Sequence, residues 1–299
     1  MNKEKIAREW FIRGCRYDSL EPNSDKAIDA YKKSIKFNNE SADAYVNLGF
    51  SYLKRENYDD ALKCFEKMVE LEPDNPEAYN NLGYVYERMK ISGSAKQMYE
   101  RTLELDKKNV EAMINIAQVL EMEGNYHAAV KQYKKAIEVD PDATAPHFCL
   151  AVLYDRHDMF DEAVQEYETV LEKDSNYLKA LFNLGNLCVQ LGDYKKAMRL
   201  FGQVLKLEPD NAQVWNNLGS IYEELKYYKE AMAAFRRSLE FNPFQEEAHV
   251  NLARIKYLQC RSNPDSSQKK EITQRLHFVM SINPQNRAVQ DLLERLAEG

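Results

Sequence analysis

One seven-residue phrase recurs along the chain at a fixed interval. It reads AYVNLGF from Ala44, AYNNLGY from Ala78, ALFNLGN from Ala180 and VWNNLGS from Val214. Successive copies start 34 residues apart or at a multiple of 34, so each copy marks one structural unit of a repeated series. Alignment on the phrase gives six consecutive units without insertion or deletion: 42–75, 76–109, 110–143, 144–177, 178–211 and 212–245.

Each unit contains two helical patterns separated by a polar turn. The first pattern of unit 42–75 has apolar or small residues at i, i+3, i+4 and i+7, namely Tyr45, Leu48, Gly49 and Tyr52. The second pattern has the same kind of stripe, namely Ala61, Cys64, Phe65 and Met68. The unit closes on LEPDN, whose proline ends one helix and suits the turn before the next. Because one hairpin cannot bury its own stripe, the hairpins must stack.

The ends of the chain follow the same pattern with variations. Residues 7–41 predict a first hairpin with one extra residue, and residues 246–286 predict an eighth, elongated around CRSNPDSSQ. Residues 287–298 place Val289, Leu292, Leu293 and Leu296 on one face and charged residues opposite, which is typical of a capping helix. We therefore expect residues 1–299 to form a single solenoid with no room for a catalytic domain.

The pattern resembles the tetratricopeptide repeat, and AYVNLGFSYLKRENYDDALKCFEKMVELEPDN fits nearly every position of that repeat. The resemblance implies an all-α fold, a right-handed superhelix of about eight hairpins plus a C-terminal capping helix. It also implies that the first helix of each hairpin lines a concave groove. KISGSA at 90–95 departs from the usual turn, and Lys107 and Ser175 replace the usual proline. Looser turns are expected there, with the repeat register kept.

An asparagine occupies the same position in most first helices, one residue before the packing pair Leu48 and Gly49 in unit 42–75. The row consists of Asn47, Asn81, Asn115, Asn183, Asn217 and Asn251, and Cys149 interrupts it. It resembles the asparagine ladder of the tetratricopeptide superhelix in O-linked N-acetylglucosamine transferases. Since an amide both donates and accepts hydrogen bonds, the row is predicted to bind the backbone of an extended peptide. The alternative is that these amides bond neighbouring hairpins or water and serve packing alone.

Large apolar side chains are expected beside the row, at Phe50, Tyr84, Ile114, Phe148 and Phe182. Aromatic residues gathered in a groove favour a binding site, although they could instead be half-buried between helices. The charged residues predicted to face the groove are mostly acidic, with nine carboxylates against five basic residues. They are Asp43, Glu77, Glu87, Glu111, Glu121, Asp155, Glu223, Glu224 and Glu247 against Lys54, Arg88, Arg156, Lys179 and Arg254. A partner segment with some basic character is therefore predicted.

Other classes of function find little support in the sequence. The net charge of −7 argues against nucleic acid, and no apolar run is long enough for membrane insertion. The charged N-terminal residues favour a cytoplasmic location over secretion. The five histidines show no metal-ligand spacing, no phosphate-binding glycine motif occurs, and no cofactor is predicted. The widely spaced Cys15, Cys64, Cys149, Cys188 and Cys260 predict free thiols.

These observations favour a non-catalytic interaction scaffold that binds an extended or helical segment of another protein. Two alternatives stay open: a co-chaperone that binds acidic chaperone tails, and the substrate-recognition arm of a larger enzyme such as a glycosyltransferase. The basic clamp expected of the co-chaperones is missing, since the corresponding positions hold Val46, Asn80, Asp43, Glu77, Asn81 and Asn115. Association between copies of the chain also stays open.

Overall fold

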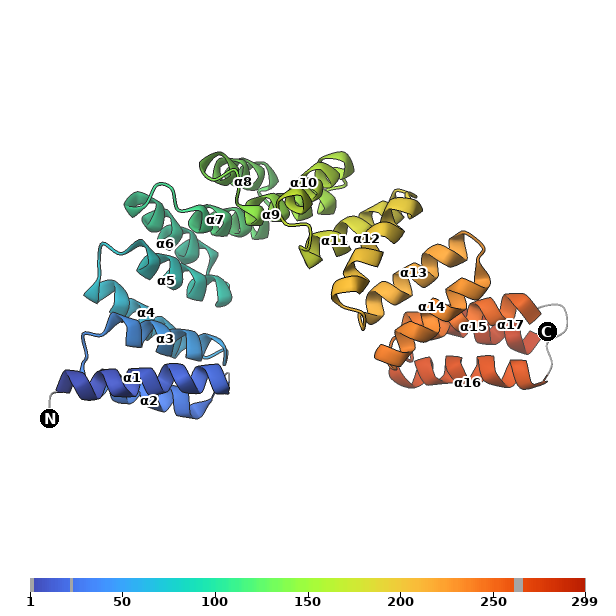
Figure 1. Cartoon of the computed structure of the whole chain (residues 1–299), viewed down its shortest axis with the longest axis horizontal. Coiled ribbons are helices and arrows are strands. Elements are labelled where there is room, and N and C mark those ends of the chain that lie inside the picture. The colour runs from blue at the N-terminus through green and yellow to red at the C-terminus, as the bar shows by residue number, and fades with distance from the viewer. Residues whose placement is uncertain (1–2, 22–23, 261–265, 299) are drawn as a thin grey trace. The chain divides into compact units, whose positions relative to one another are not determined.

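The structure is a computed structural model that describes residues 3–21, 24–260 and 266–298, apart from the side chains of residues 260, 266, 297 and 298. Within these residues the chain forms seventeen α-helices and no strand, which confirms the predicted all-α solenoid class (Figure 1). It divides into two compact units, Met1–Leu153 and Tyr154–Gly299. None of the described helices combines the length and apolar character that a membrane span requires.

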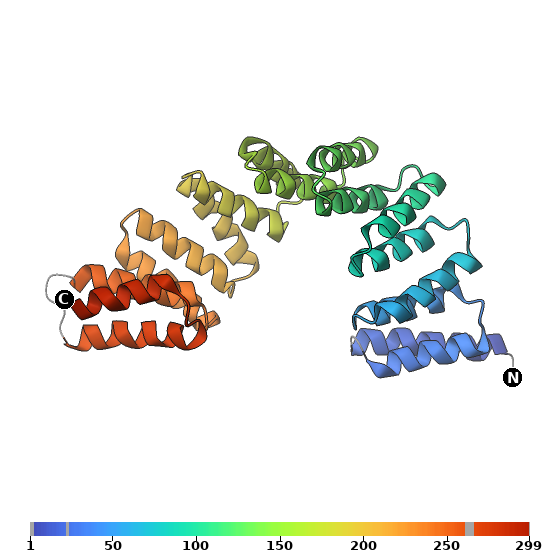
Figure 2. The same cartoon turned by 180° about the vertical axis from the view of Figure 1, so that it is seen from behind.

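The first unit is a stack of hairpins that follow one another in chain order (Figures 1 and 2). Its helices are α1 (Lys3–Leu20), α2 (Asp25–Phe37), α3 (Ala42–Leu53), α4 (Tyr58–Leu71), α5 (Pro76–Arg88), α6 (Ser92–Leu105), α7 (Val110–Met122) and α8 (Tyr126–Val139). The division between the two units falls inside α9 (Thr144–Arg156). We call the surface formed by α3, α5 and α7 the first-helix face, and that formed by α4, α6 and α8 the second-helix face.

The second unit repeats the hairpin arrangement. Its helices are α10 (Phe160–Lys173), α11 (Leu178–Gln190), α12 (Tyr194–Leu207), α13 (Ala212–Glu224), α14 (Tyr228–Phe241), α15 (Glu246–Cys260), α16 (Ser266–Ile282) and α17 (Arg287–Glu298). Val289 and Leu292 of α17 are buried in a cluster with Leu276 of α16, and Asp291 and Arg295 are exposed. The predicted segment 287–298 is thus an amphipathic helix. The part of the CRSNPDSSQ loop at 261–265 lies outside the described residues, and the organisation of the whole chain as one solenoid stays a prediction.

In five hairpins an aromatic ring of the second helix packs against a glycine of the first helix. At Gly49 an added Cβ would lie 2.7 Å from Cζ of Phe65, and at Gly83 it would lie 2.6 Å from Cε1 of Tyr99. Both rings are fully buried. The recurring small residues therefore let the two helices approach until the ring fills the space between them.

The turns of the six hairpins from α3–α4 to α13–α14 each have one residue in the left-handed conformation, at the same repeat position. These residues are Glu56, Lys90, Gly124, Asp158, Gly192 and Lys226, with φ between 57° and 78°. The turn at 90–95 keeps the common backbone conformation, because Lys90 adopts the φ that glycine has at 124 and 192. Where proline is missing, the carboxylates of Asp106 and Asp174 each accept a hydrogen bond from the backbone N–H two residues later, at 3.0 Å.

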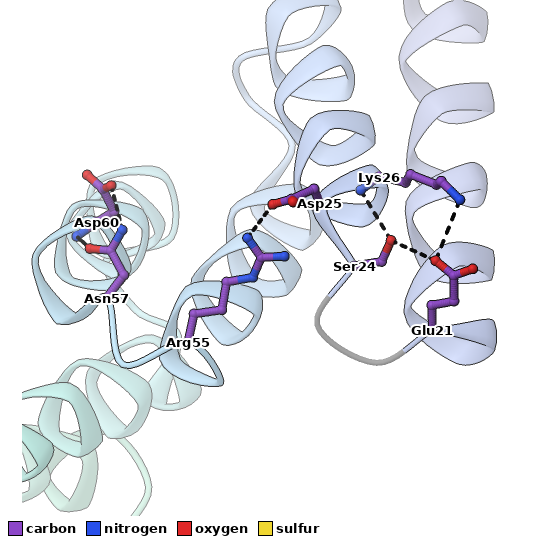
Figure 3. Close-up of polar contacts among 7 residues, drawn as sticks. All are labelled: Glu21, Ser24, Asp25, Lys26, Arg55, Asn57 and Asp60. Atoms are coloured by element: carbon purple, nitrogen blue, oxygen red, sulfur yellow. Dashed lines mark hydrogen bonds and ion pairs between the residues drawn. The ribbon is translucent and has the colours of Figure 1, made fainter.

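Polar contacts fix the turns at the start of the first unit (Figure 3). Asn57 precedes α4, and its side-chain oxygen accepts a hydrogen bond from the Asp60 backbone N–H at 3.3 Å while its amide donates to the Asp60 carboxylate at 3.0 Å. This reciprocal pair satisfies a backbone donor that the helix start leaves without a partner. Arg55, directly before this turn, forms an ion pair with Asp25 at the start of α2. The second hairpin is therefore joined to the first at its turn.

Four cysteines are free thiols: Cys15, Cys64, Cys149 and Cys188. The side chain of Cys260 lies outside the described residues. Burial raises the pKa of Cys64 to about 12 and also raises the pKa of Cys188. Both buried thiols therefore stay protonated and unreactive near neutral pH.

Candidate functional site

The row asparagines are half-buried, and several of their amides have partners inside the protein. Asn115 of α7 donates to the side-chain oxygen of Asn80 of α5, with an N to O distance of 3.1 Å. Asn217 of α13 donates to the side-chain oxygen of Asn186 of α11 at 2.7 Å. At these two positions the amide connects neighbouring hairpins, as the packing alternative predicts. The sequence analysis missed Asn80 and Asn186 as partners.

Two further members of the row also have polar contacts. The side-chain oxygen of Asn251 accepts a hydrogen bond from the Arg254 guanidinium at 3.1 Å. In the second unit, burial raises the pKa of Tyr167, and a hydrogen bond with Asn183 opposes that shift. These two amides are therefore only partly available to a ligand.

The remaining two members, Asn47 and Asn81, make no side-chain hydrogen bond to a described residue. The residue in the preceding first helix explains the difference at Asn81. Asn217 bonds Asn186, which lies three residues after the row position of α11. The equivalent residue of α3 is Phe50, whose side chain has no hydrogen-bonding group. The lack of a hydrogen-bonding group at Phe50 thus removes from Asn81 the kind of partner that Asn217 has.

The predicted apolar residues differ in exposure. Phe50 is 37% exposed and Tyr84 is 40% exposed, and both lie on the first-helix face of the first unit. Ile114 and Phe148 of the same unit are half-buried. Phe182, in the second unit, is also half-buried, and its ring centroid lies 6.3 Å from that of Phe201. Phe50 and Tyr84 are therefore the members most accessible to a ligand.

A pocket of about 410 Å³ lies on the first-helix face between α3, α5 and α7. Its lining combines aromatic, amide and charged side chains: Phe50, Leu53, Lys54, Asn80, Asn81, Tyr84, Arg88 and Glu111. The pocket thus brings together three residues predicted for the site, Phe50, Asn81 and Tyr84. The other eight predicted residues are not part of its lining: Asn47, Ile114, Asn115, Phe148, Phe182, Asn183, Asn217 and Asn251.

Two cations lie at one end of this pocket. Lys54 follows the last turn of α3, and Arg88 occupies the equivalent position 34 residues later at the end of α5. Lys54 Nζ is 3.9 Å from a carboxylate oxygen of Asp18, and a hydrogen bond with Tyr58 raises the pKa of Arg88. Glu111, in the first turn of α7, is the acidic residue of the lining. The local charge is therefore opposite to the acidic excess predicted for the groove as a whole.

Several of the predicted groove carboxylates are instead bonded inside the protein. Glu87 accepts a hydrogen bond from the Tyr99 hydroxyl at 2.8 Å, and Glu121 accepts one from Tyr133. Burial raises the pKa of Glu87, and the bond from Tyr99 opposes that shift. In the second unit Asp155 accepts from the Tyr167 hydroxyl at 3.5 Å, and the carboxylate of Glu223 lies 2.7 Å from the Arg254 guanidinium. Because these carboxylates already have partners inside the protein, they attract a basic ligand less strongly than their number suggests. No group of described residues is arranged to hold a metal ion.

The fold and this surface define a class of protein, the helical-hairpin solenoids, whose members present the faces of stacked helices to partners. Sequence models described as "TPR repeat" match residues 23–55, 51–90 and 122–157. Models described as "Tetratricopeptide repeat" match residues 76–109, 156–221 and 189–255. Since these matches together cover 23–109 and 122–255, the chain belongs to the tetratricopeptide repeat family. Proteins of this family bind other proteins. Comparison with curated protein sequences found no match.

Solved structures of low sequence identity share the fold. The human IFIT1 dimer with m7Gppp-AAAA has a TM-score of 0.63 and 14% identity over 98% of this chain and 72% of its own. The APC/C hetero-tetramer Cut9-Hcn1 has a TM-score of 0.60 and 19% identity over 98% of this chain and 58% of its own. PilF of Pseudomonas aeruginosa has a TM-score of 0.56 and 16% identity over 76% of this chain and 99% of its own. At these identities the likeness concerns the fold alone.

Proposed function

We propose that this protein is a non-catalytic interaction scaffold that binds a segment of a partner protein on its first-helix face. The observation that carries the proposal is the pocket between α3, α5 and α7. It combines two exposed aromatic rings, Phe50 and Tyr84, with the amide of Asn81, which bonds no side chain among the described residues. Buried aromatic contacts supply most of the energy of such interfaces, and an amide can bind a peptide backbone of any sequence.

The lining also indicates how a segment would be oriented. An apolar side chain fits between Phe50 and Tyr84, and the peptide backbone would bond Asn81. A basic side chain of the ligand would lie near Glu111, and an acidic one near Lys54 and Arg88. A partner of mixed charge thus fits this pocket better than the basic partner predicted from the sequence. The ladder function of the row is proposed for Asn47 and Asn81 first, because their amides are available.

A cytoplasmic location is part of the same proposal. Its support is the set of free thiols Cys15, Cys64, Cys149 and Cys188, since reduced cysteines are usual in the cytosol. The non-catalytic role is supported by the match of the hairpin family to most of the chain.

The test is capture of partners from an extract of the source cell. The wild-type chain is compared with the variant Phe50→Ala/Tyr84→Ala and with the control Tyr227→Ala/Phe244→Ala. The control removes two aromatic rings that are 56% and 68% exposed in the second unit. Partners of the pocket should be captured by the wild type and the control and lost with the first variant. With a purified partner, each pocket substitution should weaken binding by about 2 kcal/mol.

Equal capture by the wild type and the pocket variant would contradict the proposal. A ribonuclease-treated sample belongs in the same experiment, because one structural neighbour was solved with a capped RNA. Loss of all capture on this treatment would show that the protein binds RNA, directly or through its partners, and would also count against the proposal. Sedimentation of the purified chain would show whether copies of it associate.

A further inference from the structure

A second hollow of the first unit is lined by residues of α6, α7 and α8. It has a volume of about 930 Å³, and its lining includes Ile116 and Leu120 of α7 below and polar side chains of α6 and α8 on the two walls. We call it the lysine groove, after the four lysines of its walls: Lys96, Lys131, Lys134 and Lys135. The function proposed above does not use this groove.

The charge of the lysine groove is opposite to that of the protein. Its four lysines are accompanied by two acidic residues, Glu100 and Glu138, in a chain of net charge −7. None of the four lysines forms an ion pair with a described residue. Other lysines of second helices do so, as in the pair of Lys67 with Glu70 at 2.7 Å. Unpaired cations gathered on an acidic protein attract an anionic partner.

In the second unit an ion pair joins the two equivalent second helices. Glu168 of α10 bonds Lys196 of α12 at 2.8 Å, so the two helices are bridged. The same repeat positions in α6 and α8 hold Glu100 and Ala128. Because alanine cannot bond Glu100, no such bridge forms between α6 and α8. No ion pair of this kind between described residues crosses the lysine groove, so a ligand can enter between α6 and α8.

We propose that the lysine groove binds an acidic segment of a partner protein, with carboxylates on the lysines and an apolar side chain over Ile116 and Leu120. Charge complementarity supports an acidic occupant. The apolar floor matches a peptide side chain and has no counterpart on a phosphate backbone. Glu100 and Glu138 on the walls would repel the regularly spaced phosphates of a nucleic acid, whereas a segment of a protein can place a neutral residue beside each. The groove follows α8, whose 14 residues span about 20 Å.

The probe is a fluorescein-labelled peptide of about fourteen residues, the length of α8, with leucine at every fourth position and glutamate or serine elsewhere. Fluorescence anisotropy with the full chain at about 50 mM salt should show saturable binding that weakens as salt rises. The variant Lys131→Glu/Lys134→Glu/Lys135→Glu should lower the affinity at least about tenfold. The control Lys195→Glu/Lys206→Glu/Lys229→Glu makes the same charge change at exposed lysines of the second unit and should lower it less than about threefold.

Circular dichroism checks that both variants are folded, and Lys131→Gln/Lys134→Gln/Lys135→Gln replaces the first variant if it is not. Absence of binding, or an equal loss in the groove and control variants, would overturn the proposal. A single-stranded RNA of the same length that binds more tightly and loses affinity in the groove variant would overturn the choice of a protein partner. An equal or larger loss with Phe50→Ala/Tyr84→Ala would show that the peptide binds the pocket on the first-helix face instead and would overturn the proposal.

Discussion

The same repeat positions are used differently in the two units. In the first unit, Phe50 and Tyr84 leave a pocket on the first-helix face, and the amide of Asn81 opens into it and bonds no side chain among the described residues. In the second unit the equivalent of Phe50 is Asn186, and the amide of Asn217 bonds it at 2.7 Å. An amide oxygen supplied by the preceding helix thus holds the row members Asn115 and Asn217, whereas Phe50 supplies none to Asn81.

The pairs in the layer below this face vary from hairpin to hairpin, in both units. Glu87 and Tyr99 of the first unit form a hydrogen-bonded pair, whereas Val189 and Phe201 occupy the same repeat positions in the second unit. A polar pair and an apolar pair therefore fill equivalent space. What must be preserved at these positions is the match within each pair, not the identity of either residue.

The largest effect on stability is expected at the polar pair of Glu87 and Tyr99. Tyr99→Phe removes the hydroxyl that bonds the half-buried carboxylate of Glu87, so we expect a loss of about 2 kcal/mol in the free energy of unfolding. Urea unfolding measures it. The double variant Glu87→Leu/Tyr99→Phe reproduces the pair of Leu53 with Phe65 and should recover most of the loss. If the double variant is as unstable as the single one, the pairs are not interchangeable.

The same variant has a predictable pH dependence. Burial raises the pKa of Glu87, and the Tyr99 hydroxyl opposes that shift. Removing the hydroxyl raises the pKa further. A carboxyl group whose pKa is higher in the folded state contributes stability at low pH that is lost as pH rises through the folded pKa. The loss caused by Tyr99→Phe should therefore be smaller at about pH 4 than at about pH 8.

A smaller effect is expected where the row asparagine is bonded internally. Asn217→Ala leaves the Asn186 oxygen without its donor, and we expect a loss of about 1 kcal/mol in stability. A double-mutant cycle with Asn186→Ala, measured by urea unfolding, should give a coupling energy of about 1 kcal/mol between the two side chains. Additive losses would show that the hydrogen bond contributes nothing to folding.

The substitution Phe50→Asn tests whether the residue in the preceding helix decides if Asn81 is bonded internally. Phe50→Asn places in α3 the residue type that binds Asn217 in the second unit. A double-mutant cycle with Asn81→Ala should then show a coupling of about 0.5 kcal/mol that is absent when Phe50 is present. Capture of pocket partners should fall at the same time, since the aromatic wall is lost. No coupling in the Phe50→Asn background would mean that the preceding helix does not control the row.

The smallest effect on stability is expected at the free member of the row. Asn81→Ala removes no hydrogen bond to a described residue, so the free energy of unfolding, measured with urea, should change by less than about 0.5 kcal/mol. Binding of a pocket partner, measured by calorimetry, should weaken by about 1 kcal/mol. The opposite pattern, lower stability with unchanged binding, would show that Asn81 serves packing and does not bind a ligand.

The sequence was sufficient to predict the all-α class and the hairpin repeat, because the 34-residue register is repeated without interruption and each helix has its own apolar stripe. It also predicted Phe50, Asn81 and Tyr84, which line one pocket. It did not distinguish these from Asn115 and Asn217, whose hydrogen bonds depend on residues at two different offsets of the neighbouring helix. The repeat shows which residues share a position, but not which amides find a partner across the stack.

The count of groove charges illustrates the same limit. Glu87 and Glu223 were counted as acids available to a ligand, but they bond Tyr99 and Arg254. A signal was present in the sequence, since tyrosine in the second helix accompanies an acidic residue in the first at Glu87, Glu121 and Asp155. Leu53, Val189 and Glu223 stand at that place where the second helix has phenylalanine, and the acidic Glu223 bonds Arg254 instead.

The left-handed residues of these six hairpin turns also bear on how this chain can change over generations. Only Gly124 and Gly192 suit that conformation without strain; Glu56, Lys90, Asp158 and Lys226 are exposed and adopt it at a cost of about 1 kcal/mol each. Selection has thus left roughly 4 kcal/mol of stability unused at these four turn positions. A change to glycine there could compensate for a destabilising substitution on either face. The turns therefore give the lineage room to acquire new partners while the hairpins stay folded.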